Sequence, residues 1–213
     1  MSSFWSYDKE TKTVHIDYKY DGELTGLPAD TEIIIFDEQQ PKYSKYSHFN
    51  QPINQIGLPP NLKRIYFGSN YNKPINEGIL PNSITHLTFG HSFDQPVNTL
   101  PLNITHLTFG WGFNQPVDTL PPNITHLTFG YSFDQPVNNL PDSITHLSFG
   151  VNFNQPVDKL PNSLLSLAFL GFTFYKSLDM LPDSIKYLTI PKNYSMENVK
   201  LPFGCEIKYA TPY

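Results

Sequence analysis

Residues 80–99 read LPNSITHLTFGHSFDQPVNT, and this stretch decides the fold because the chain repeats it. Four units of the same form begin 20 residues apart from Leu80 to Leu160, and looser versions extend the pattern on both sides. A period near ~20 residues is typical of a solenoid in which each unit forms one turn. The Leu-Pro pairs that open the units begin at Leu27, Leu58, Leu80, Leu100, Leu120, Leu140, Leu160, Leu181 and Leu201.

Within the unit, Ile84 to Phe89 has the pattern of a strand. Leu87 and Phe89 lie two residues apart and are expected to point inward together. Ile84 lies three residues before Leu87, so the chain must turn into the strand there. This L-x-x-L-x-L spacing is the rhythm of leucine-rich repeats. Pro96 and Pro101 disfavour a helix on the way back, which predicts an extended or irregular return segment.

One such unit cannot bury its own apolar face, so neighbouring units must stack. Stacking aligns the strands in a parallel sheet, ~4.8 Å apart, and aligns their phenylalanines in a continuous column. The predicted fold is a β-rich solenoid: a leucine-rich-repeat-like right-handed arc with one parallel strand per ~20–22-residue repeat. We expect an N-terminal β-hairpin cap over residues 1–26, repeats over 27–200 with the first interrupted near 37–48, and a C-terminal capping strand over 201–213.

Two phrases carry a family resemblance. Phe49-Asn50-Gln51-Pro52-Ile53 and Phe113-Asn114-Gln115-Pro116-Val117, together with the recurring Leu-Pro-x-Ser-Ile and Leu-Thr-Phe-Gly, resemble the FNIP repeat. This relative of the leucine-rich repeat is found in social amoebae and in giant viruses of amoebae. The resemblance covers about residues 27–201. It implies a solenoid fold and a protein-interaction role, and it brings no catalytic residues to carry over.

Composition narrows the classes of function. With 39% hydrophobic and 15% charged residues, the chain is too apolar for a disordered protein. Its net charge of −5, without a lysine- or arginine-rich cluster, gives no basis for binding nucleic acid. No stretch approaches the ~20 apolar residues of a membrane span. Cys205 is the only cysteine and residues 1–10 lack an apolar core, so we expect an intracellular, non-secreted protein in the cytoplasm, or in the host cytoplasm if it is viral.

A column of histidines is the first candidate site. The members, one per unit at the same position, are His86, His106, His126 and His146. Strand alternation places them on the exposed face of the sheet, between two columns of threonine or serine. One interpretation is a metal site or a pH sensor. The other is a purely structural ladder of neutral rings, since no Asp, Glu or Cys joins the column to complete a metal site.

The residue after each Phe-Gly pair is the second candidate, because it differs between units that otherwise agree. His91, Trp111 and Tyr131 occupy it in successive units and are expected to form an exposed aromatic patch at the rim of the sheet. The alternative is that a rim position tolerates any residue and drifts. The insertion over residues 42–48 is a further candidate loop.

Other recurring residues are assigned structural roles. Asp and Asn alternate between units at the position of Asp94, either to avoid repulsion between stacked carboxylates or as a trace of a duplicated two-unit block; these side chains should bond turn backbone. Gly90 and its equivalents should mark tight backbone corners. Paired catalytic carboxylates would need a concave pocket, and a repeating convex row of them offers none.

The sequence therefore predicts a non-catalytic protein-interaction module, for example a viral or amoebal adaptor that engages a host protein. We expect no cofactor, an unidentified protein partner, no nucleic-acid or membrane partner, and a monomer. The alternatives are a rod-like structural component of a larger assembly and, more remotely, metal binding through the histidine column.

Overall fold

Each Leu-Pro pair begins a β-turn that directs the chain into a strand. In the unit that starts at Leu80, the N–H of Ile84 donates to the C=O of Pro81 over 3.1 Å, and Ile84 is fully buried. The same bond, from the third residue after proline back to its carbonyl, recurs in every unit from Pro28 to Pro202. The turn places Ile84 under the strand, which is why it breaks the two-residue alternation.

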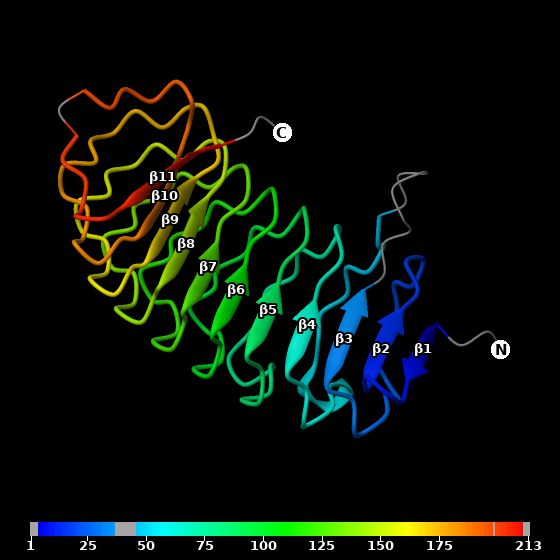
Figure 1. Ribbon diagram of the computed structural model, residues 1–213. Helices are drawn as coiled ribbons and strands as arrows, with labels where there is room; N and C mark the ends of the chain where they lie inside the picture. The colour runs from blue at the N-terminus through cyan, green and yellow to red at the C-terminus, as the bar shows by residue number, and fades with distance from the viewer. Residues whose placement is uncertain (1–3, 37–45, 198, 211–213) are drawn as a thin grey trace.

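The computed structural model describes residues 4–36, 46–197 and 199–210, and its strands form one sheet in chain order (Figure 1). The first two strands are antiparallel, and all later neighbours are parallel. A 3-10 turn over Gln55–Gly57 is the one helical element among the described residues. The predicted solenoid is therefore confirmed. The strands are β1 (Trp5–Asp8), β2 (Thr13–Ile16), β3 (Ile33–Phe36), β4 (Arg64–Tyr66), β5 (His86–Thr88), β6 (His106–Thr108), β7 (His126–Thr128), β8 (His146–Phe149), β9 (Ser166–Phe169), β10 (Tyr187–Ile190) and β11 (Glu206–Tyr209).

Two columns of aromatic rings fill the core. The first contains the predicted strand-end phenylalanines, such as Phe89 and Phe109, whose ring centroids lie 5.7 Å apart. The second lies on the return segments and includes Phe49, Tyr71 and Phe93, and its Phe93 stacks on Phe89 at 3.7 Å. Every ring in the repeats thus contacts its own turn and the next. An isolated turn would lack the contacts to neighbouring turns. Stacking of the turns therefore supplies most of the burial of these rings.

The Asp/Asn position ties successive return segments together. The Oδ1 of Asp94 accepts the backbone N–H of Asn114 at 2.9 Å and the Nε2 of Gln115 at 3.0 Å. Asn114 repeats both bonds with Asp134 and Gln135. The predicted bonding of backbone by these side chains is confirmed. Only one acceptor oxygen is needed, so the alternation of Asp and Asn leaves every one of these bonds intact.

Glycine recurs at the strand ends for a different reason from the tight backbone corners that the sequence led us to expect. Among the glycines of the described chain, only Gly26, Gly78 and Gly204 have positive φ, so the strand-end glycines need no unusual backbone angle. A Cβ placed on Gly130 would instead lie 1.9 Å from the carbonyl oxygen of Gly110 in the turn below. Glycine is required there because consecutive turns approach each other too closely for a side chain.

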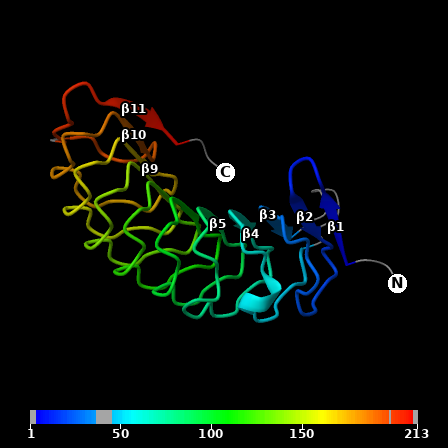
Figure 2. The same ribbon diagram turned by 90° about the horizontal axis from the view of Figure 1, so that it is seen from below.

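The sheet lines the inner, concave side of the arc and the return segments lie outside it (Figure 2). Ring spacing shows the cause: between neighbouring turns it grows from 4.2 Å for His86–His106 on the exposed sheet face, to 5.7 Å for Phe89–Phe109, to 6.2 Å for Phe93–Phe113. Backbone hydrogen bonds hold the strands at ~4.8 Å, while bulky return segments spread apart, so the stack bends toward the sheet.

The N-terminal hairpin is tied to the first repeats by a charged cluster. The Glu32 carboxylate accepts from Lys12 of the hairpin at 2.7 Å and from Lys63 of the next turn at 2.6 Å. These two lysines lower the pKa of Glu32 to about 2. The hairpin strand β2 runs parallel to β3, whereas β1 runs the opposite way and ends the parallel stack on that side.

Candidate functional site

The rim residues form a continuous aromatic stack. The ring centroids of His91 and Trp111 lie 5.4 Å apart, and those of Trp111 and Tyr131 lie 4.1 Å apart with planes 6° from parallel. Backbone bonds beside the rings keep the turns aligned, since the N–H of Gly112 donates to the C=O of His91 at 2.7 Å and that of Ser132 to the C=O of Trp111 at 2.9 Å. Trp111 remains 50% exposed. We call His91, Trp111 and Tyr131 the aromatic rim.

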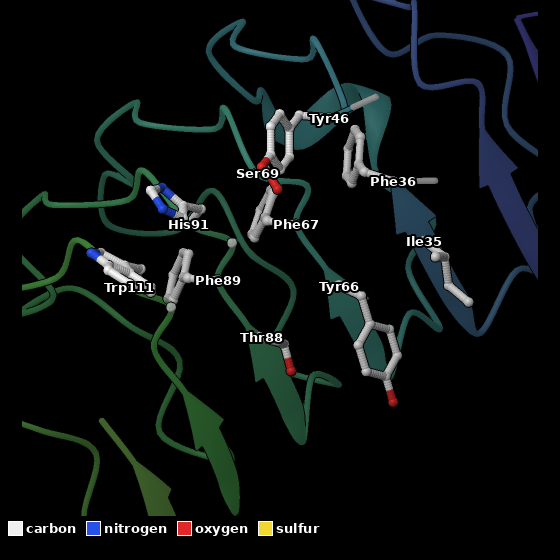
Figure 3. Close-up of a pocket in the computed structure, with 12 residues that line it drawn as sticks. Ile35, Phe36, Tyr46, Tyr66, Phe67, Ser69, Thr88, Phe89, His91 and Trp111 are labelled. Carbon is white, nitrogen blue, oxygen red and sulfur yellow. The ribbon is translucent and has the colours of Figure 1, made fainter. Parts of the chain in front are cut away.

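A hollow lies on each side of Trp111. The first, of about 550 Å³, has His91 and Trp111 on one side and Phe36 with Tyr46 on the other (Figure 3). The second, of about 360 Å³, lies between Trp111, Tyr131 and the side chains of Val151 and Leu170. Both are shallow and largely apolar. The floor of the second is glycine backbone from Gly110, Gly130 and Gly150, so the missing side chains that permit close stacking also open this hollow.

Part of the lining lies outside the positions expected from the sequence. Ile35 and Tyr66 border the first hollow, and strand register aligns them with Thr88. Leu170 borders the second and stands where Gly150 stands one turn earlier. The sequence does mark these residues, because each is a larger apolar side chain at a position that holds threonine or glycine in the regular units. Of the predicted insertion loop, residues 42–45 lie outside the described residues.

The four histidines form a stack of their own at the opposite end of the strands from the aromatic rim. Successive ring centroids are 4.2, 4.3 and 4.2 Å apart. Register extends the column to Arg64 on one side and Ser166 on the other. None of the four lines either rim hollow. The aromatic rim and the histidine column are thus two separate surfaces on one concave face.

Threonines fix the proton on each imidazole. The hydroxyl of Thr105 donates to the C=O of Thr85 at 3.1 Å and lies 2.9 Å from the Nδ1 of His106. Because the single hydroxyl proton goes to the carbonyl, Nδ1 must be the donor in its bond with the threonine oxygen. The neutral ring then leaves the lone pair of Nε2 as a free acceptor. The same arrangement holds for His126 and His146.

This geometry suits a ladder of neutral rings. Each strand contributes one imidazole, and each ring stacks face to face on the next. In the part of the chain that the structure describes, no three or more His, Cys, Asp or Glu side chains are grouped so that they could hold a metal ion. The contacts therefore favour a structural ladder over a metal centre.

The ladder makes stability depend on pH. Burial, the neighbouring imidazoles and Arg64 lower the pKa of His86 to about 4, and burial is the main cause of the lowered pKa values of His106 and His126. The folded state therefore resists protonation that the unfolded chain accepts near pH 6.5. Stability should be full above about pH 6.5 and should fall as the pH drops toward 4, because the unfolded state binds more protons in that window. The ion pairs of Glu32 affect stability only at lower pH, below the pKa that a glutamate has in the unfolded chain.

Urea unfolding at pH 7, 6, 5 and 4.5 measures this effect, and His106→Asn with His126→Asn is the matched variant. Its unfolding midpoint should change less between pH 7 and 4.5 than that of the parent protein. An NMR titration that finds His86, His106 and His126 at or above pH 6.5 in the folded protein would refute the prediction.

Cys205 takes the place of Ile84 in the last unit, since its N–H donates to the C=O of Pro202. The side chain is partly buried and packs against the core. Burial, together with Glu206, raises the pKa of the thiol. Both features disfavour the thiolate that a nucleophilic cysteine requires.

The strand-and-turn unit, its L-x-x-L-x-L core and the concave sheet define a solenoid of the leucine-rich-repeat class. The family model of the FNIP repeat matches residues 49–92, 113–150 and 136–172. The chain belongs to the FNIP repeat family.

Two solved structures resemble the chain. CroV588 of a giant virus, described as a novel circular leucine-rich-repeat protein, is 36% identical over 92% of this chain, with a TM-score of 0.73. The match spans 33% of the length of CroV588. YopM from Yersinia enterocolitica WA-314 is 20% identical over 89% of this chain and 44% of its own, with a TM-score of 0.41. No curated protein matches the chain. Among the described residues, no helix has the length and apolar character needed to cross a membrane.

Proposed function

We propose that this protein is a non-catalytic interaction module whose aromatic rim, with the two hollows beside it, is the contact surface for a protein partner. The fold supports this proposal because leucine-rich-repeat solenoids are commonly protein-interaction scaffolds. In this proposal the protein is a viral or amoebal adaptor, and its partner is a protein of the host cell. The likeness to CroV588 supports the viral setting.

The observation that carries the proposal is the exposed stack of Trp111 on Tyr131, with an apolar hollow on each side. Tryptophan and tyrosine are enriched among residues that dominate binding energy. Stacking at 4.1 Å holds both rings in place before binding, so little side-chain entropy is lost on association. The hollows can receive apolar side chains of the partner.

Removal of the stack should abolish binding and leave the fold intact. A partner is first isolated from the native cell with the parent protein as bait, and its dissociation constant is then measured with purified components. Trp111→Ala with Tyr131→Ala should raise that constant about 100-fold or more, since hot-spot truncations each cost about 2 kcal/mol or more. Both side chains are outside the core, so the unfolding midpoint should change little.

Leu102→Ala is the matched control, because Leu102 is 64% exposed and lines neither hollow. It should bind like the parent protein. A second variant, His126→Ala, separates the two surfaces of the concave face. If His126→Ala weakens binding and the rim double variant does not, the contact lies on the histidine column and the proposal for the rim fails.

A further inference from the structure

The last turns of the described chain carry exposed apolar side chains near the edge of the sheet. Strand β11 is last in the sheet, and no described strand bonds to its outer edge. Ile207 and Tyr209 continue the core-facing columns of Leu188 and Ile190, yet Tyr209 is 54% exposed. Six of the ten exposed large apolar side chains of the described chain lie in these last turns: Phe172, Tyr175, Met180, Tyr187, Phe203 and Tyr209.

The two ends of the stack differ in direction. At the N-terminal end the antiparallel β1 ends the parallel series, and its tip carries a hydrogen-bonded Asp8 turn. At the other end of the described sheet β11 runs parallel to β10, and like β1 it is an edge strand whose outer side presents backbone groups to an approaching strand. Among the described residues, the turns next to β11 carry exposed aromatic side chains, which distinguishes this edge from that of β1.

Backbone geometry specifies how a strand could pair with this edge. The N–H groups of Glu206 and Ala210 point back, to the carbonyls of Lys186 and Ile190. Because successive amides of a strand point to opposite sides, the N–H and C=O of Ile207 point outward. An antiparallel partner centred on Ile207 would therefore exchange both of its hydrogen bonds with that residue.

In this register, the side chains of β11 are complementary to those of β11 in a second copy of the chain. The sequence Glu206-Ile207-Lys208 is self-complementary about Ile207. With Ile207 opposite its own counterpart, Glu206 faces Lys208 of the second copy, and Lys208 faces its Glu206. Both residues are exposed on the concave face, where directly opposite side chains of an antiparallel pair lie closest.

We propose that the chain forms a two-fold symmetric dimer through antiparallel pairing of β11 with β11 of a second copy, centred on Ile207. This contact is isologous, so it closes and does not propagate into a fibre. It joins two eleven-stranded sheets edge to edge and covers the exposed Tyr209 on both copies. A dimer replaces the monomer expected from the sequence, and it leaves the aromatic rim of each copy free.

Charge reversal with compensation tests the register. Sedimentation equilibrium of the 213-residue chain should give twice 24.4 kDa. Glu206→Lys or Lys208→Glu alone should raise the dimer dissociation constant about tenfold or more, because symmetry turns both ion pairs into like-charged pairs at once. The swapped double variant, Glu206→Lys with Lys208→Glu, should restore the parent value.

Any other result in these measurements would contradict the proposed dimer. A parent chain that stays monomeric at the highest concentration reached has no such interface. A dimer that tolerates both single reversals, or that the double swap fails to restore, uses another surface or register. Far-ultraviolet circular dichroism confirms that the variants fold. Trp111→Ala with Tyr131→Ala should remain dimeric, so failure of the dimer and failure of the rim as a binding surface can be told apart.

Discussion

Phe129→Ala is expected to lower the free energy of unfolding by about 3–5 kcal/mol, the range for removing a buried aromatic ring. Phe129 is 1% exposed and sits in the middle of the solenoid. Its ring lies 3.7 Å from that of Phe133 in its own turn, and 5.6 Å from those of Phe109 and Phe149 in the neighbouring turns. The cavity cannot collapse, because the hydrogen-bonded sheet fixes the spacing between turns.

Urea unfolding followed by circular dichroism measures this loss, with Leu102→Ala as the control. Leu102 is 64% exposed, so its truncation should change stability by no more than about 0.5 kcal/mol. In a solenoid each turn contacts only its neighbours, so loss of a central ring should also weaken the coupling between the two halves. A Phe129→Ala protein within about 1 kcal/mol of the parent would show that the aromatic columns do not hold the stack.

Gly130→Ala is expected to destabilise the fold by about 3 kcal/mol, the upper end of the usual cost of overpacking. The new Cβ would lie 1.9 Å from the carbonyl oxygen of Gly110 and 2.4 Å from its carbonyl carbon. Both atoms are backbone and cannot move aside as a side chain would. The two turns would have to separate, which strains the bond from the N–H of Phe109 to the C=O of Thr128.

Gly78→Ala is the matched control, because it makes the same chemical change for a different cost. Gly78 has a φ of 76°, and no atom lies within 4 Å of the position that a Cβ would take there, so alanine suffers only the unfavourable backbone angle. That angle costs about 1–2 kcal/mol. Gly130→Ala should therefore be the more harmful of the two in the same urea assay. The reverse order would mean that backbone angle, and not close approach, selects glycine at the strand ends.

Most of the fold could be predicted because the sequence repeats it. The spacing of Ile84, Leu87 and Phe89 specifies a turn and a strand, and all three side chains are buried in the stack. Less of the candidate site could be predicted from the sequence. Its variable position picked out Trp111 and Tyr131, but Tyr66 and Leu170 belong to irregular units whose alignment depends on register.

The sequence by itself determined the unit, the inward columns, the histidine column on the opposite face of the strands, and the family, because each follows from a period of two residues within the strand or ~20 along the chain. Only the tertiary structure decided the curvature, the reason for glycine at the strand ends, the separation of the aromatic rim from the histidine column, and the open edge at β11. These depend on distances between turns. Such distances are the balance between fixed backbone hydrogen bonds on one side of the stack and bulky return segments on the other, and no single unit contains that information.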